Sequence, residues 1–237
     1  MSKTAGRKHT NFFGAFTCIE LLACLAACAL LVAIIAPALA VARARSDRVA
    51  CLSNLRQIGN AFRQFGLEHN DIMPWRQQAG TDGNYNEPGK HELWFQYWWL
   101  RGSIGTPRIL MDPAETRPSA RIATTWNLDE NGGLQSLKNR GVAYVLGVDS
   151  STDLPRSLLV ADRNILNSGY TGGGLSTAVR VSASTTRWLD DVHGTFGNVA
   201  LADGSVDSLD SEGLRRAIAV SRGLDDYARV MIADWGQ

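Results

Sequence analysis

The sequence predicts an α+β fold in which a long N-terminal α-helix, membrane-spanning in its first half, packs on a C-terminal antiparallel β-sheet domain. Three observations predict it. The 22 residues from Leu21 to Ala42 contain no charged or strongly polar side chain. An amphipathic pattern with a helical period follows directly, and short β-branched runs bounded by turn residues fill the region beyond it.

The apolar run is long enough to cross a membrane. At about 1.5 Å per residue, a helix from Leu21 to Ala42 is about 33 Å long, against a hydrocarbon core of about 30 Å. Pro37 lies inside the run and removes one backbone donor, so we expect a bend near the outer third of the helix. Glu20 stands directly before the run. Placing a carboxylate at the edge of a membrane-spanning helix costs free energy, so such a residue usually has a partner or a function.

The helix is expected to continue over an amphipathic segment at residues 43–70. No proline occurs between Pro37 and Pro74, so a single helix from about Phe16 to Leu67 is predicted, far longer than a typical globular helix. Its apolar positions recur every three or four residues, which predicts one buried face made of Val49, Leu52, Leu55, Ile58, Phe62 and Phe65.

Residues 71–237 have the composition of an ordinary folded domain. Apolar residues make up 45% of the chain and charged residues 20%, with a formal net charge of +1, so no basic excess indicates a nucleic-acid partner. Asp203-Gly204 between two alternating runs predicts a hairpin with a two-residue turn. Short aliphatic runs bounded by Gly, Pro or Asp predict further strands at 142–148, 157–161, 178–183 and 187–192.

The end of the chain is predicted to form two short helices. Asp210 or Ser211 can cap the first, and the second is expected over residues 225–235. Glycine-rich loops are expected at 79–89, 131–133 and 169–174. The first loop carries several oxygen ligands but lacks the full spacing of a calcium loop, so a plain polar turn is preferred over a calcium site at Asp82, Asn84, Asn86 and Glu87.

The N-terminal residues resemble those of a known class of membrane proteins. A basic leader, a small residue and a short apolar motif with one glutamate resemble the processing site of type IV pilins and type II secretion pseudopilins: Lys3, Arg7, Lys8, Ala15 and Phe16-Thr17-Cys18-Ile19-Glu20-Leu21-Leu22. The resemblance implies a leader at residues 1–15, cleavage between Ala15 and Phe16 by a prepilin peptidase, and N-methylation of Phe16. The usual pattern has Leu where this chain has Cys18.

The same resemblance implies a role for Glu20 and a location for the chain. In filaments of this family the corresponding carboxylate pairs with the terminal amine of a neighbouring subunit, so Glu20 would direct assembly with other pilin-like subunits. Residues 16–42 would be the membrane and assembly half of the helix, and 71–237 the globular head. Basic residues flank the span almost equally, so only the resemblance places the N-terminus in the cytoplasm, the helix in the inner membrane and the head outside it.

A second resemblance lies near the C-terminus. His193, nine intervening residues and Asp203-Gly204 reproduce the His-x9-Asp-Gly signature of pilin-like proteins typical of planctomycetes. A structural role is preferred for these residues: the His193 ring would bond to the backbone, and Asp203 would set the turn. The alternative is a metal or acid–base cluster of His193 with Asp190, Asp191 and Asp203. No metal ligand and no cofactor is assigned.

The cysteines indicate little disulfide chemistry. Cys18, Cys24 and Cys28 lie in the membrane-spanning half of the helix, where they are expected to pack as small apolar residues, and Cys51 lies outside that half. Related sequences often carry a second cysteine before a proline, where this chain has Asp112-Pro113. The family disulfide is therefore expected to be absent here, and Cys51 is expected to be a free thiol.

Two functions other than a filament subunit stay open. Leu25-Ala26-Ala27-Cys28 matches the lipobox of a lipoprotein, although the apolar run continues for 14 residues beyond Cys28. The aromatic segment 93–100 could bind carbohydrate or a partner if exposed, but burial under the long helix is preferred. No Gly-x-Ser-x-Gly or His-Glu-x-x-His motif is present, so an enzyme is not expected.

Overall fold

The computed structural model describes residues 17–76, 92–127, 132–166, 178–221 and 227–232. It forms two compact units, Met1–Arg43 and Ala44–Gln237, which are described separately below. The proposed cleavage site at Ala15 and Phe16 and the loops at 79–89 and 169–174 lie outside the described residues.

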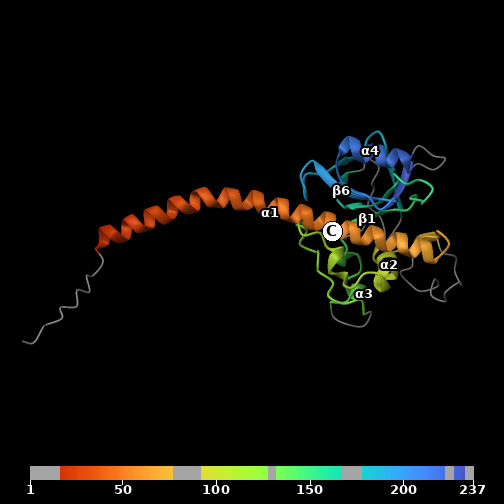
Figure 1. Ribbon diagram of the computed structural model, residues 1–237, viewed down its shortest axis with the longest axis horizontal. Helices are drawn as coiled ribbons and strands as arrows, with labels where there is room; N and C mark the ends of the chain where they lie inside the picture. The colour runs from red at the N-terminus through yellow and green to blue at the C-terminus, as the bar shows by residue number, and fades with distance from the viewer. Residues whose placement is uncertain (1–16, 77–91, 128–131, 167–177, 222–226, 233–237) are drawn as a thin grey trace, which may run out of the picture. The chain divides into compact units, whose positions relative to one another are not determined.

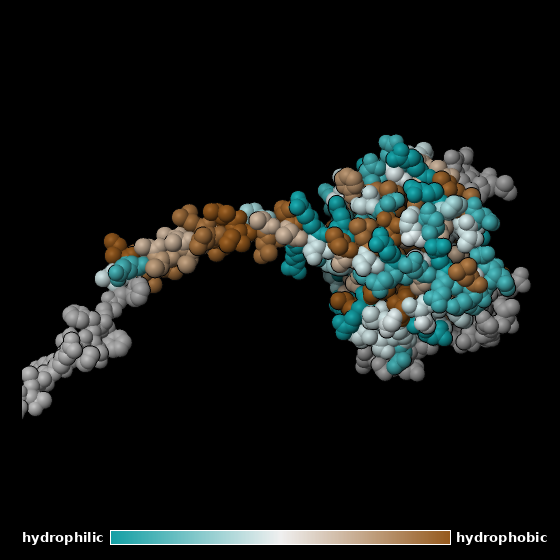
Figure 2. All heavy atoms as spheres, in the orientation of Figure 1, coloured by the Kyte–Doolittle hydropathy of each residue, from teal (hydrophilic) through white to brown (hydrophobic). Residues whose placement is uncertain are grey.

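One helix, α1, runs from Cys18 to Glu68 and confirms the predicted long helix to within two residues (Figure 1). Pro37 lies inside it, and the helix continues past this residue. Residues 17–46 are all exposed, and their apolar side chains form a continuous brown surface in Figure 2. By length and composition, α1 is long and apolar enough to span a membrane.

The second half of α1 supplies one face to the core of the unit Ala44–Gln237. Its buried positions follow a helical period and are Cys51, Leu55, Ile58, Gly59, Ala61, Phe62, Phe65 and Gly66. The predicted stripe is therefore correct from Leu55 onward and wrong at its start. Val49 is 66% exposed, because at about 100° per residue it lies about 160° around the helix from Cys51, which takes the buried position.

The core of this unit is a six-stranded antiparallel sheet with the strand order β4-β8-β1-β2-β6-β7. Its strands are β1 (Tyr144–Gly147), β2 (Leu158–Asp162), β4 (Ala178–Ser182), β6 (Phe196–Leu201), β7 (Val206–Asp210) and β8 (Tyr227–Met231). A separate pair is formed by β3 (Ile165–Leu166) and β5 (Arg187–Trp188). The predicted strands are confirmed, although 187–192 shortens to β5.

The sheet separates two apolar layers. On one face, Tyr144 and Leu146 of β1 pack with Phe62 of α1. On the other face, Val145 packs with Leu214 of α4 (Ser211–Val220), whose predicted cap at Asp210 accepts a hydrogen bond from the Gly213 N–H at 2.7 Å. This alternation along β1 is the period of a strand covered on both faces.

The last strand corrects a prediction. Residues 227–231 form β8 rather than part of a second C-terminal helix. Ala228 and Val230 are buried, and Arg229 between them is exposed. This two-residue alternation suits a place between β4 and β1, where pairing on both sides overrides the helix preference of Ala and Arg.

The aromatic segment is helical and buried. It forms α2 (Leu93–Trp98) and a 3₁₀ helix, η2 (Trp99–Gly102). The side chains of Trp94, Phe95, Tyr97 and Trp98 are buried. Among the aromatic residues of this segment, only Trp99 is partly exposed. The preferred prediction of burial is thus confirmed. The remaining short helices are η1 (Pro74–Arg76), η3 (Pro107–Leu110), α3 (Leu134–Leu137) and η4 (Lys138–Gly141).

Candidate functional sites: the helix start and a buried polar cluster

Glu20 takes part in a capping box at the start of α1. Its carboxylate accepts hydrogen bonds from the backbone N–H and the hydroxyl of Thr17, both at 2.9 Å, and the Thr17 hydroxyl accepts from the Glu20 N–H at 3.4 Å. This reciprocal pattern satisfies helix N–H groups that otherwise have no partner. Sequence reasoning missed it, although the Thr-x-x-Glu spacing was readable.

Four side chains with metal-ligand chemistry meet inside the unit Ala44–Gln237. They are Cys51, Asp112, Asp162 and His193, and we call them the buried cluster. All four are buried, and one ligand atom of each lies within 4.8 Å of those of the other three. They come from α1, the segment after η3, the end of β2 and the loop before β6. The long separations along the sequence explain why no motif joins them.

Direct contacts hold the buried cluster together. The Cys51 Sγ lies 3.0 Å from Oδ1 of Asp162 and is positioned to donate to it. The His193 Nε2 lies 3.0 Å from Oδ2 of Asp112 and 3.7 Å from Oδ2 of Asp162. The preferred prediction of a backbone partner for the His193 ring is wrong, because the ring contacts two carboxylates. These carboxylates are not those of Asp190, Asp191 or Asp203, which the alternative named. Arg48 donates to the His193 carbonyl at 2.8 Å.

An irregularity in β2 directs Asp162 toward α1. The pairing register of β2 with β6 shifts between Leu158 and Val160, and both Leu159 and Val160 belong to the core layer that contains α1. Without this bulge, strict alternation would place Asp162 on the α4 side. One inserted residue therefore moves the carboxylate to the side of Cys51.

The electrostatics of the buried cluster follow from its burial. Burial, followed by the charge of Asp112, raises the pKa of Asp162. Burial also raises the pKa of the Cys51 thiol, and both carboxylates add to this. For His193, burial alone would lower the pKa, but the hydrogen bond to Asp112 and the charges of both carboxylates outweigh it and raise the pKa. The structure has Cys51 as a free cysteine, as expected.

The two parts of the His-x9-Asp-Gly signature lie at opposite ends of β6 and act separately. Asp203 accepts hydrogen bonds from the Ser205 N–H and hydroxyl at 2.8 and 2.6 Å, which confirms its role in the turn. The turn itself has three residues, not two, because Leu201 N–H bonds to the Ser205 carbonyl. Gly204 has φ of +85°, as expected for the bulge that ends such a loop.

We expect Gly204→Ala to lower the free energy of unfolding by about 1–2 kcal/mol, the usual cost of a left-handed backbone for a residue with a Cβ. The new Cβ would also lie 2.8 Å from the Arg63 guanidinium, which would have to move. Urea unfolding followed by tryptophan fluorescence measures the change. Gly102→Ala is the control, since a Cβ there meets nothing within 4 Å; an equal loss in both variants would contradict the argument.

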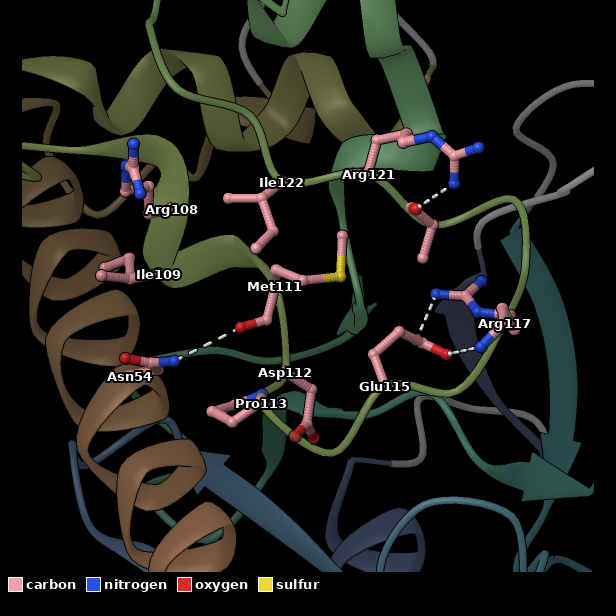
Figure 3. Close-up of a pocket in the computed structure, with 11 residues that line it drawn as sticks. Asn54, Arg108, Ile109, Met111, Asp112, Pro113, Glu115, Arg117, Arg121 and Ile122 are labelled. Carbon is pink, nitrogen blue, oxygen red and sulfur yellow. Dashed lines mark hydrogen bonds and ion pairs between the residues drawn. The ribbon is translucent and has the colours of Figure 1, made fainter.

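A pocket of about 550 Å³ lies beside the buried cluster. Asp112 belongs to both, and Asn54 of α1 lies next to it in the pocket lining, where its side chain donates to the Met111 carbonyl at 3.5 Å (Figure 3). Near its rim, Glu115 accepts hydrogen bonds from Arg117 at 2.6 Å and from Arg163 at 2.7 and 2.8 Å. Arg163 also pairs with Asp191 at 2.7 Å. Together these groups form an ion-pair network.

Comparison with known proteins finds no matching family model, no similar curated protein and no similar solved structure. The residues that sequence reasoning missed are Asp162, Asp112 as a partner of His193, and Thr17. Of these, only Thr17 left a local signal, since the partners of His193 come from other elements.

Proposed function

We propose that this chain is a structural, pilin-like subunit of a type II secretion or type IV pilus-like assembly, anchored in the inner membrane by α1 and processed by a prepilin peptidase. The observation that carries the proposal is the composition of one helix. The first half of α1 is apolar and exposed, with a single carboxylate in its first turn, and the second half supplies the buried face of a sheet domain. A lipid-facing half and a core-forming half suit a subunit that must be anchored and must also assemble.

Glu20 would have two successive partners in this function. In the isolated chain its carboxylate accepts from Thr17 in the capping box. In a filament, the amine freed at Phe16 of a neighbouring subunit would compete for the same oxygens. A charged amine in a low-dielectric environment is a stronger partner than a neutral N–H.

The competing functions find less support in the described residues. A carbohydrate-binding module needs displayed aromatic rings, and those of Trp94, Phe95 and Tyr97 are buried. A tethered hydrolase needs an accessible nucleophile. Cys51 lies near His193, but its side chain is fully buried and its pKa is raised, which is the opposite of an activated thiol.

Mass analysis of the protein isolated from its native membrane tests the proposal. We expect the mature chain to begin at Phe16 with a methylated amine. A chain that still carries Met1–Ala15, or one that begins at a lipidated Cys28, would overturn it.

A matched variant separates processing from assembly. Glu20→Ala should be cleaved normally but should be lost from filaments sheared off the cells, because the partner for the incoming amine is removed. Thr17→Val, which removes the capping hydroxyl and keeps the carboxylate, is the control and should still assemble. Normal assembly of Glu20→Ala would remove the proposed role of this carboxylate.

A further inference from the structure

We propose that the buried cluster of Cys51, Asp112, Asp162 and His193 is a binding site for a structural zinc ion. This inference does not depend on the filament function. It rests on the donor set, the geometry, the way each carboxylate is held and an unpaired polar group beside the site.

The donor set selects the metal. One thiolate, one imidazole and two carboxylates provide sulfur, nitrogen and oxygen ligands, all of which Zn²⁺ accepts. Calcium and magnesium take oxygen ligands almost exclusively, so the sulfur of Cys51 and the imidazole of His193 disfavour them. Four protein ligands in a closed, buried site are typical of structural rather than catalytic zinc.

The distances fit a tetrahedral site after small movements. Bonds of about 2.0–2.3 Å at tetrahedral angles place ligand atoms about 3.3–3.6 Å apart. The Cys51 Sγ lies 3.0 Å from Oδ1 of Asp162, and the His193 Nε2 lies 3.0 Å from Oδ2 of Asp112 and 3.7 Å from Oδ2 of Asp162. One ligand atom from each of the four residues can be chosen so that all four lie within 4.8 Å of one another. Side-chain shifts of about 1 Å or less would therefore form the site.

Backbone groups already orient both carboxylates. The Ala114 N–H donates to Oδ1 of Asp112 at 2.8 Å and leaves Oδ2 facing His193. The Asn198 N–H donates to Oδ2 of Asp162 at 2.7 Å and leaves Oδ1 facing Cys51. Backbone N–H groups that hold a carboxylate in place act as the outer shell of a metal site does.

The side chain of Asn198 supplies an independent observation. Asn198 is fully buried, and within the described residues neither its Oδ1 nor its Nδ2 has a hydrogen-bond partner. Ala200, two residues after Asn198 in β6, belongs to the core layer that contains α1. Because side chains alternate along a strand, Asn198 lies on the same face of the sheet. An unpaired buried amide is rare. Here the Asn198 backbone bonds to Asp162, so the unpaired amide lies next to the proposed ligands.

A polar network without metal explains these contacts less well. The thiol of Cys51 is a weak donor for a buried carboxylate. Asp112 and Asp162 both face the same nitrogen of His193, so one ring N–H has to serve two carboxyl groups. On zinc binding the thiol loses its proton to solvent and His193 presents an unprotonated Nε2. One thiolate, two carboxylates and Zn²⁺ together carry a net charge of −1. The guanidinium of Arg48, which donates to the His193 carbonyl, lies close enough to balance this charge.

The test uses the full, untagged chain purified in detergent without chelators. We expect about one zinc per chain by elemental analysis, and a zinc X-ray absorption spectrum with one sulfur and three nitrogen or oxygen ligands. Cys51→Ser and His193→Gln should each weaken zinc affinity more than about tenfold, as loss of outer-shell groups alone does. His69→Gln, at another described histidine, is the control and should leave the affinity unchanged.

Three results would overturn the proposal. The first is the absence of stoichiometric zinc after incubation with zinc and dialysis. The second is unchanged affinity in Cys51→Ser. The third is an absorption spectrum with no sulfur, or with several sulfurs as expected from the cysteines of the apolar helix; because it uses the unaltered chain, this measurement decides the question even where a variant fails to fold.

Discussion

Replacing Leu55 by alanine is expected to lower the free energy of unfolding by about 3–5 kcal/mol, the upper part of the range for buried leucines. Leu55 is fully buried in the core layer that contains α1 and the sheet. Gly59 one turn later brings α1 close to β6, since a Cβ at Gly59 would lie 3.3 Å from that of Ala200. With helix and sheet so closely packed, the structure can collapse only partly into the cavity.

Leu67→Ala is the matched control for this prediction. It makes the same chemical change in the same helix, but Leu67 is 77% exposed, so a change within about 0.5 kcal/mol is expected. Urea unfolding monitored by tryptophan fluorescence reports on both variants, since the tryptophans of α2 and η2 lie in or against the same layer. Similar losses in the two variants would show that α1 does not stabilise this unit through the packing described here.

How far the sequence predicts this fold depends on how local each signal is. The bounds of α1 were predictable because its apolar run and its helical period are properties of consecutive residues. Strands β1, β2 and β4 were predictable for the same reason. The error at Val49 arose because a stripe of apolar residues does not show which of them will face the rest of the fold. The position of the sheet decides that Cys51, and not Val49, is buried.

The buried cluster was not predictable, since its members meet only through tertiary structure. Cys51 and Asp162 are 111 positions apart, and their contact requires the bulge in β2, which reverses the side to which Asp162 points. His193 was found through its signature, but the preferred prediction gave its ring a backbone partner. The alternative considered only the aspartates near it in sequence, Asp190, Asp191 and Asp203. Likewise, residues 227–231 became a strand because β4 and β1 offer pairing edges on both sides.

Glu115→Gln is expected to lower the free energy of unfolding by about 3 kcal/mol at neutral pH, the low end for breaking a buried ion pair. The carboxylate is 4% exposed and accepts from both Arg117 and Arg163. Glutamine keeps the shape but removes the charge, so two adjacent guanidinium groups lose their shared counter-ion. Chemical denaturation at pH 7 measures the loss.

The effect should depend on pH in a defined direction. Burial alone would raise the pKa of Glu115, but hydrogen bonds from Arg117 and Arg163 and the charge of Arg117 outweigh it and lower the pKa to about 2. Since the folded pKa lies below the ordinary value of 4.5, the ionised group adds stability above that value, and this is lost as the pH falls toward 2. The difference between wild type and Glu115→Gln should therefore shrink in acid, and a constant difference would contradict the assignment.

Asp191→Asn provides the control, because Asp191 pairs with the same arginine. Its contact with Arg163 is as short, at 2.7 Å, as the Glu115 contact, but its side chain is 40% exposed against 4% for Glu115. Solvent screens the exposed pair, so a loss of less than about 1 kcal/mol is expected. Both carboxylates contact Arg163 at the same distance, so the contrast reports on the burial of Glu115 together with its second partner, Arg117. An equal loss of unfolding free energy in both variants would mean that each carboxylate stabilises the network equally whether it is buried or exposed. Burial would then not explain the stability of the network.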